Sequence, residues 1–277
     1  MPQDVLIQGV EAEGGWLRER GFQFGDGLFE TIAIIDEKPC LWGAHMARLA
    51  EGCDRLRLPQ PDFSQLSEES RRVCAGHPRA VLKLYWTAGQ SERGYRRPAA
   101  TSPRRVISRC AWHQTAREWA VRQCEHRLAE GPALAGIKHL NRLDQVIARA
   151  EWEDDGIAEG LMLGQDGRVV CGTMSNVLIQ HGETLLTPAI DGAGISGVVR
   201  NLALDLAGRS GNPVRVGAVT LDDVRAADAL FLSNSLIGVA RVRRYESTDY
   251  DPEFGEHPVI SETRRLCHQP QAWGHGQ

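Results

Sequence analysis

The sequence is poor in lysine and lacks the long apolar runs of a membrane protein. Only three lysines occur among its 277 residues, Lys38, Lys83 and Lys138, so arginine carries nearly all of the positive charge. No apolar run approaches the roughly 20 residues that cross a bilayer. The first residues show no basic start followed by an apolar stretch, as a signal peptide would. We therefore expect a cytoplasmic protein without a membrane partner.

Cysteine pairs and an excess of basic charge are also missing. The seven cysteines are odd in number and none form a C-x-x-C pair, and the nine histidines are dispersed. This pattern predicts neither a disulfide framework nor a metal site. The net charge of −4 gives no overall basic field, so we expect no nucleic-acid partner. An enzyme or binding protein for a small molecule is the remaining expectation.

The first part of the chain has the pattern of short strands with two helices. A polar turn containing proline, 36–39, separates two apolar runs. Strands are expected at 5–7, 28–35, 80–87 and 105–111, and helices at 43–57 and 64–75. We assign residues 1–114 to a small N-terminal domain and place the boundary at 114–118.

The second part, residues 115–277, is predicted to be a larger domain. Asn141 is a plausible N-cap for a helix with apolar residues at i, i+3, i+4 and i+7. Further helices are expected from about Gly197 and over 257–267, and strands at 120–125, 157–163, 168–171, 176–180, 184–187, 229–233 and 237–242. The tail from His268 is expected to be disordered. Helices and strands mix without regular βαβ alternation, so the predicted class is α+β.

The three lysines differ in their surroundings. Lys38 lies in the turn, where a solvated amine is usual, and Lys83 has apolar neighbours that direct it to an edge or a cleft. Lys138 lies in a short link directly before the predicted helix, flanked by Gly136 and apolar residues. A partly desolvated amine has a lowered pKa and is a better nucleophile toward a carbonyl. Lys138 is therefore the candidate for amine chemistry.

A glycine-rich loop at 192–200 opens the second helix of this part. Free N–H groups at a helix start favour a phosphate, although a plain turn fits the same sequence. Arg48 on the first helix and the hydroxyl-rich loop 233–235 are, taken separately, as typical of a surface or a cap as of a site.

Taken together, these segments resemble the fold-type IV pyridoxal-phosphate enzymes, from Arg20 to about Arg243. The matching segments follow in the family's order at 20–31, 45–49, 138–143, 172–177, 194–200 and 233–235. Within that family, K-H-L-N-R-L at 138–143 and R-G-Y at 93–95 are most similar to the aminodeoxychorismate lyases. The resemblance implies a two-domain α+β architecture, the cofactor pyridoxal 5'-phosphate and a homodimer.

The resemblance also implies roles for particular residues. Lys138 would carry the cofactor covalently and later shuttle a proton, and Arg48 would grip the cofactor phosphate. The phosphate cup would be completed by Gly197, the backbone of Val198 and Val199, and Asn234 and Ser235. The cofactor would also contact Cys171, Ser175 and Asn176, and the residues around the substrate would be Glu30, Thr31, Arg93 and Tyr95.

One position departs from the family. Cys171 stands where the family usually has a glutamate, whose carboxylate keeps the cofactor's pyridine nitrogen protonated and makes the ring an electron sink. A neutral thiol is a weak hydrogen-bonding group and cannot pair with a pyridinium. Four explanations are open: an uncharged pyridine, a Cys171 thiolate, substitution by a nearby acid such as Glu183, or an impaired enzyme.

The resemblance implies a lyase that converts 4-amino-4-deoxychorismate to 4-aminobenzoate and pyruvate in folate biosynthesis. Its small-molecule substrate becomes aromatic in the reaction, and this driving force would tolerate the weaker electron sink at Cys171. Two alternatives remain: an aminotransferase for D-amino or branched-chain amino acids on the same scaffold, and a non-catalytic protein that binds the cofactor or a metabolite.

Overall fold

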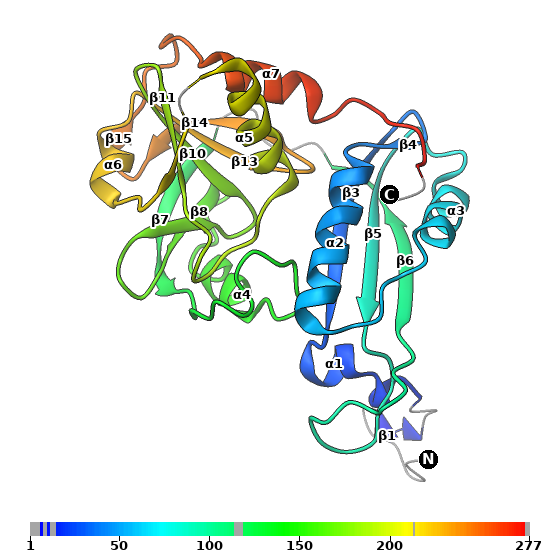
Figure 1. Ribbon diagram of the computed structural model, residues 1–277. Helices are drawn as coiled ribbons and strands as arrows, with labels where there is room; N and C mark the ends of the chain where they lie inside the picture. Colours follow the sequence, from blue (N-terminus) through cyan, green and yellow to red (C-terminus); the bar gives the residue numbers. More distant parts are fainter. Residues whose placement is uncertain (1–5, 8–9, 12–14, 114–118, 213, 275–277) are drawn as a thin grey trace.

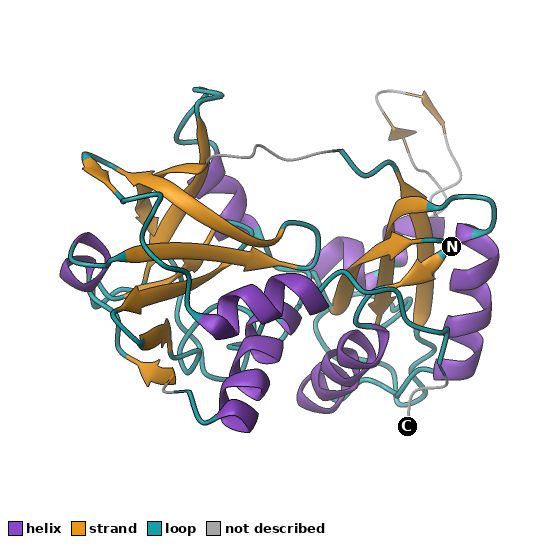
Figure 2. Cartoon of the chain, turned by 90° about the horizontal axis from the view of Figure 1, so that it is seen from above, coloured by secondary structure: helices purple, strands orange, loops and turns teal. Residues whose placement is uncertain are grey.

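The computed structural model describes residues 6–7, 10–11, 15–113, 119–212 and 214–274, and within them the chain forms two lobes (Figure 1). Viewed from above, each lobe keeps its own sheet and its own helices (Figure 2). The domain boundary that the sequence predicts at 114–118 lies outside the described residues. The mixture of parallel and antiparallel strands confirms the α+β class.

The small lobe is built on a four-stranded antiparallel sheet in the order β4-β3-β5-β6. Alternate residues of β3, among them Leu28, Ile32 and Ile34, are buried against the helices that cover one face of the sheet. The elements are β3 (Gly27–Ile35), β4 (Lys38–Pro39), β5 (Arg79–Thr87), β6 (Arg104–Cys110), α2 (Trp42–Leu56) and α3 (Phe63–Cys74). Before them come β1 (Leu6–Ile7), β2 (Val10–Glu11), the 3₁₀ helix η1 (Gly15–Arg18) and α1 (Arg20–Phe24).

The large lobe contains a sheet with the strand order β12-β11-β10-β13-β14-β7-β8-β9, and β15 pairs with β14. The strands are β7 (Trp119–Arg127), β8 (Ile157–Leu163), β9 (Val169–Gly172), β10 (Asn176–His181), β11 (Thr184–Pro188), β12 (Val214–Gly217), β13 (Ala229–Asn234), β14 (Gly238–Tyr245) and β15 (Thr248–Asp249). Because β9 also contacts β10 and β11, the sheet curls around an apolar core. The helices are α4 (Leu143–Arg149), α5 (Val198–Ser210), α6 (Leu221–Arg225) and α7 (Pro258–Leu266).

The strands and helices predicted between residues 28 and 267 are present, with their ends shifted by a few residues. The sequence prediction missed β2, η1, α1, β4, α6, β12 and β15, each of which spans no more than five residues. The strand predicted at 229–233 continues to Asn234, so part of the expected loop 233–235 belongs to β13.

The predicted cap and buried face of α4 are wrong. The helix begins at Leu143 after Arg142, and no side chain caps it. Asn141 donates instead to the carbonyl of Gly25 at 3.1 Å, across the boundary between the lobes. The apolar face faces outward: Leu143 is 74% and Ile147 50% exposed. The helical period was read correctly, but the apolar face of α4 lies on the surface of this chain.

The expectation of a disordered tail is wrong for residues 268–274. After α7 the chain returns to the small lobe, where the backbone N–H of Gln271 donates to Pro39. The indoles of Trp42 and Trp273 pack edge to face, and their N–H groups donate to the carbonyls of Gly274 and Glu37. The tail is rich in glycine, proline and glutamine, which are typical of disorder, so the sequence prediction overlooked this anchor. Its side-chain contacts depend on one tryptophan, Trp273.

We predict that Trp273→Ala lowers the free energy of unfolding by about 1–3 kcal/mol, because it removes an aromatic pair and a hydrogen bond. Chemical denaturation followed by circular dichroism measures the change. Gln269→Ala is the matched control, since this side chain lies in the same tail and is exposed. Equal midpoints for both variants would contradict the anchor.

Candidate functional site

A cavity of about 570 Å³ lies where the two lobes meet, and both lobes line it. The small lobe contributes residues of α2, β3 and β5. The large lobe contributes the start of α4 and α5, the turn between β9 and β10, and the turn after β13. Of the predicted site residues, those on the cavity wall are Thr31, Arg48, Lys138, Cys171, Ser175, Asn176, Gly197, Val198, Asn234 and Ser235.

Lys138 is held in the cavity by a link that pairs with β3. Its carbonyl accepts from the N–H of Phe29 at 3.0 Å, and Leu140 donates to Gly27 at 3.0 Å. The Nζ atom lies 4.3 Å from the centroid of the Phe29 ring. Burial, followed by the charge of Arg48, lowers the pKa of Lys138 to about 7. The link therefore presents a largely desolvated amine, as the sequence predicted.

The glycine-rich loop and α5 form one end of the cavity. Gly136 donates to Gly194 at 3.0 Å, and Ser196 donates back to Gly136 at 2.8 Å, so this loop runs beside the lysine link. Gly197 is the N-cap of α5, and no side chain satisfies the first N–H groups of the helix. A Cβ atom on Gly197 would lie 1.8 Å from Oδ1 of Asn176, so only glycine fits. This helix start is suited to an anion.

The side chain of Val199 does not line the cavity, and the prediction had assigned only the backbone of this residue to the phosphate cup. Its side chain is buried in the core shared by α5 and α7. The first turn of α5 directs Val198 to the cavity and the next residue inward. Val199 can therefore offer the site no more than its backbone N–H.

Glu30 also lies off the cavity wall, behind Arg48. Its carboxylate accepts from Nε and Nη2 of Arg48 and faces Nδ1 of His45 at 2.7 Å. Burial alone would raise the pKa of Glu30, but Arg48 and His45 hold it at about 2. The third nitrogen of Arg48 donates to the carbonyl of Ser196 at 3.0 Å. Glu30 thus orients Arg48, so the expected direct contact with substrate is not what the geometry provides.

Thr31 and Ser235 join the lobes at the cavity. The hydroxyl of Ser235 donates to the carbonyl of Thr31 at 2.6 Å, and Lys83 donates to the hydroxyl of Thr31 at 3.0 Å. Asn234 fixes the turn after β13 by accepting from two backbone N–H groups. Lys83 points into a cleft, one of the two orientations that its apolar neighbours indicated.

Arg93 and Tyr95 do not reach this cavity within one chain. They line a separate hollow beside α1. Arg20 donates to the carbonyl of Tyr95 at 2.8 Å and stabilises this loop beyond the end of β5, leaving Tyr95 85% exposed. The structure therefore does not bring these two predicted substrate residues together with Lys138.

The wall of the cavity is strongly cationic. Among the described residues that line it there is no aspartate or glutamate, whereas five are basic: Arg48, Lys83, Lys138, Arg142 and Arg149. Sequence reasoning did not single out Arg142 and Arg149, although Arg142 stands inside the K-H-L-N-R-L motif, four residues after Lys138 and directly before α4. The charge suits a ligand with several negative groups.

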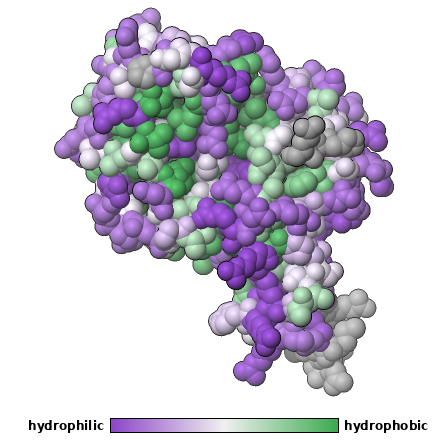
Figure 3. Space-filling model, in the orientation of Figure 1, coloured by the Kyte–Doolittle hydropathy of each residue, from purple (hydrophilic) through white to green (hydrophobic). Residues whose placement is uncertain are grey.

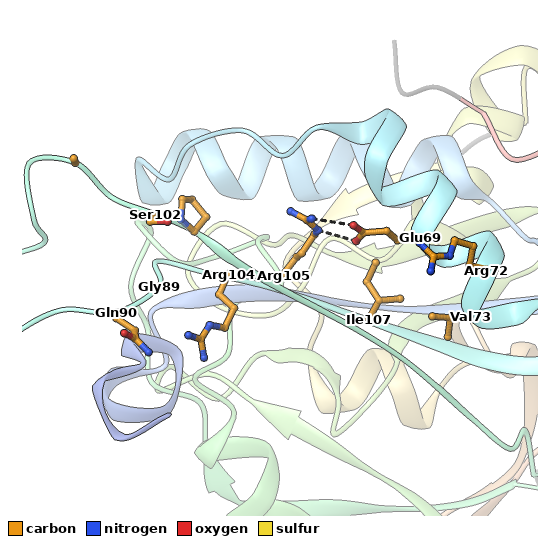
Figure 4. Close-up of a pocket in the computed structure, with 11 residues that line it drawn as sticks. Glu69, Arg72, Val73, Gly89, Gln90, Ser102, Arg104, Arg105 and Ile107 are labelled. Atoms are coloured by element: carbon orange, nitrogen blue, oxygen red, sulfur yellow. Dashed lines mark hydrogen bonds and ion pairs between the residues drawn. The ribbon is translucent and has the colours of Figure 1, made fainter. Parts of the chain in front are cut away.

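The small lobe carries another hollow, which lacks the features of a site. It lies between α3 and β6, and its lining includes a bidentate pair between Arg105 and Glu69 (Figure 4). These charges largely satisfy each other, and no lysine lines the hollow.

In the space-filling view, apolar residues gather on the large lobe, and the protruding lower part is mainly hydrophilic (Figure 3).

Two further searches cover the described part of the chain. No helix there is long and apolar enough to span a membrane. No group of three or more histidine, cysteine or acidic residues there is arranged to hold a metal ion.

Comparison with known proteins gives consistent results. The family model described as amino-transferase class IV matches residues 27–245. The aminodeoxychorismate lyase of Vibrio harveyi is 32% identical over 257 residues, which cover 90% of this chain and 93% of that protein. The crystal structure of 4-amino-4-deoxychorismate lyase from Pseudomonas aeruginosa is 41% identical, with a TM-score of 0.82 and 93% of each chain covered.

The branched-chain amino acid aminotransferase of Escherichia coli has the same fold. It aligns with a TM-score of 0.80 over 94% of this chain and 93% of its own, at 21% identity. Together with the match over most of the chain, this confirms the predicted two-lobed architecture. The protein therefore belongs to the class IV aminotransferase family, the fold-type IV pyridoxal-phosphate enzymes that its motifs predicted.

Proposed function

We propose that the protein is a 4-amino-4-deoxychorismate lyase, which forms 4-aminobenzoate and pyruvate for folate biosynthesis. The observation that carries the proposal is the buried amine of Lys138. Its pKa is lowered to about 7, and it lies in a cavity lined by basic side chains. The two relatives reported above are lyases by name and align over nine tenths of the chain. The K-H-L-N-R-L and R-G-Y motifs point to the same activity.

The residues present fit pyridoxal phosphate. The uncapped start of α5, Arg48 and Ser235 would hold the phosphate, and Asn176 and Ser175 would flank the ring. Lys138 would form the covalent link. When bound, this cofactor supplies a carbonyl that captures amines and a ring that takes up electrons.

The remaining chemistry belongs to the protein's own side chains. At neutral pH much of Lys138 is unprotonated, so its Nζ atom can act as nucleophile and afterwards as base. As base, Nζ removes the proton from the substrate carbon that bears the amine, and it holds that proton while the enolpyruvyl group leaves. Lys83 and Arg149 provide positive charge for the two substrate carboxylates. Glu30 fixes the position of Arg48, because its carboxylate accepts hydrogen bonds from two of the guanidinium nitrogens.

An aminotransferase on the same scaffold is the second candidate. The family and the shared fold with the branched-chain enzyme favour it. It requires a strong electron sink, and no carboxylate lines the cavity among the described residues. For this reason the lyase is preferred.

We further propose that the protein is a homodimer. The outward face of α4 exposes Leu143, Val146 and Ile147 beside the cavity, and Met174 extends the same apolar surface. Arg93 and Tyr95 can serve a substrate only in another copy, because they lie away from the cavity of their own chain. A second copy that covers α4 would bury the apolar face. It would also give Arg93 and Tyr95 a cavity to serve, that of the other copy.

A cytoplasmic location is part of the proposal. All seven cysteines are free thiols, and six of them are buried. Unpaired cysteines in this number are typical of a reducing compartment.

The first prediction concerns the pH dependence of cofactor attachment. Only the neutral amine attacks a carbonyl, so the rate of covalent attachment to apo-protein should rise with pH and level off above about 7, the lowered pKa of Lys138. A lysine of ordinary pKa would continue to gain rate up to about pH 10. Stopped-flow absorbance after addition of pyridoxal phosphate gives the rate.

Two variants control this experiment. Lys138→Ala should show no attachment at any pH, and Lys38→Arg, which alters an exposed lysine on β4, should behave like the wild type. A borohydride-reducible adduct on another lysine in Lys138→Ala would contradict the assignment.

The second prediction is the activity itself. With aminodeoxychorismate as the only substrate and no 2-oxo acid, the loaded protein should release 4-aminobenzoate and pyruvate in equal amounts over many turnovers. Coupled detection of both products measures this. If a yellow protein gives neither product but exchanges amino groups with 2-oxo acids, the aminotransferase is the correct reading; if it does neither, the protein only binds the cofactor.

The third prediction tests the dimer. Ile147→Glu should weaken self-association by roughly 2 kcal/mol or more, the range of central interface residues. Sedimentation velocity gives the molecular mass in solution. Val216→Glu is the matched control, because Val216 is equally exposed at 52% but lies on β12. A wild type that sediments as a monomer would refute the proposal.

A further inference from the structure

We propose that this chain holds the cofactor's ring nitrogen without a proton, with the thiol of Cys171 and the guanidinium of Arg142 as its surroundings. The inference rests on the proposed cofactor and concerns a different property of the same site. It selects one of the explanations that the sequence left open at Cys171.

Cys171 itself is a neutral thiol. The side chain is buried at the end of β9 and lines the cavity. Burial, with the nearby charge of Glu159, raises the pKa of Cys171 to about 12. Arg142 acts in the opposite direction but does not overcome these effects. Burial therefore favours the neutral thiol over the thiolate.

Arg142 adds a positive charge beside this thiol. It lies on the cavity wall directly before α4, and one of its nitrogens contacts Nε2 of His139. Burial and the charge of Arg142 lower the pKa of His139 to about 4, so this imidazole accepts the contact as a neutral ring. The Nε atom of Arg142 is buried and donates to no group in the described part of the chain. The site therefore has an unused donor next to Cys171.

Glu159 is the buried carboxylate behind this wall, but its hydrogen-bonding capacity is already used. It accepts from the hydroxyls of Thr173 and Ser175 and from the N–H groups of Gly160, Thr173 and Met174. It is fully buried and does not line the cavity. A Cβ atom on Gly172 would lie 2.8 Å from its Oε2, so Glu159 packs directly against the backbone of this cavity residue. Glu159 fixes the turn and does not face the ring.

Glu183 is also excluded. It lies in the turn between β10 and β11, at the opposite end of β10 from Asn176, and its carbonyl faces the ring of His257. It is absent from the cavity wall. Among the described residues, no carboxylate faces the place that resemblance assigns to the ring nitrogen.

The groups that remain match a nitrogen with a free lone pair. A protonated nitrogen is a donor and a cation, and it requires an acceptor with negative charge. Cys171 offers an S–H group and Arg142 offers N–H groups, so both act as donors, and Arg142 repels a second positive charge. The consequence is a weak electron sink, which is sufficient for an elimination driven by aromatisation and insufficient for efficient amino transfer.

The test is the ¹⁵N NMR signal of the ring nitrogen in protein loaded with ¹⁵N-labelled pyridoxal phosphate. We expect the wild type to give the signal of an unprotonated pyridine at pH 7. Cys171→Glu should give the protonated signal, and Cys171→Ser, which adds no charge, should remain like the wild type. Amino transfer by Cys171→Glu should increase by about tenfold or more, the effect of ~1.4 kcal/mol on the barrier.

A protonated nitrogen in the wild type would overturn the inference, whatever the variants do. Glu159→Gln would then identify the acid, by loss of that proton. An unprotonated signal in a folded, cofactor-loaded Cys171→Glu would overturn it equally, because position 171 would then not govern the nitrogen. The signal is read without substrate, so absent lyase activity would count against the proposed function and leave this inference standing.

Discussion

The site depends on the pairing between the link 136–140 and strand β3. Two backbone hydrogen bonds attach Lys138 and Leu140, which come from the large lobe's part of the chain, to the first residues of β3 in the small lobe. Two more bonds join Gly136 to the loop that opens α5. One short segment thus sets the distance between an amine, an anion-binding helix start and Arg48. The side chains could not meet in this arrangement if either lobe moved independently.

Charge in the cavity is organised in layers. Basic side chains line the wall. Behind it Glu30 holds Arg48 and Glu159 holds the turn between β9 and β10, and both acids are saturated by hydrogen bonds. A buried carboxylate in this position fixes geometry without neutralising the space in front of it. The cavity therefore keeps a positive field toward its ligand.

The sequence predicted most of this site because its signals are local. Lys138 was recognisable from its short link, Gly197 from the loop that opens a helix, and the strands from their period of two. Glu159 and the tail anchor were not predictable, because their partners are distant in sequence and follow no motif. Glu30, Arg93 and Tyr95 were assigned by resemblance, which names a position but does not say whether its side chain lies in front of or behind the wall, or in another subunit.

The return of residues 268–274 to the small lobe has a consequence for biosynthesis. The ribosome delivers Trp42 more than 200 residues before the tail that packs against it, since the contact between Trp42 and Gly274 spans 232 positions. The early lobe must therefore persist with part of its apolar surface open until the last helix has been made. Docking of residues 268–274 on the small lobe is therefore a late, non-local step of folding.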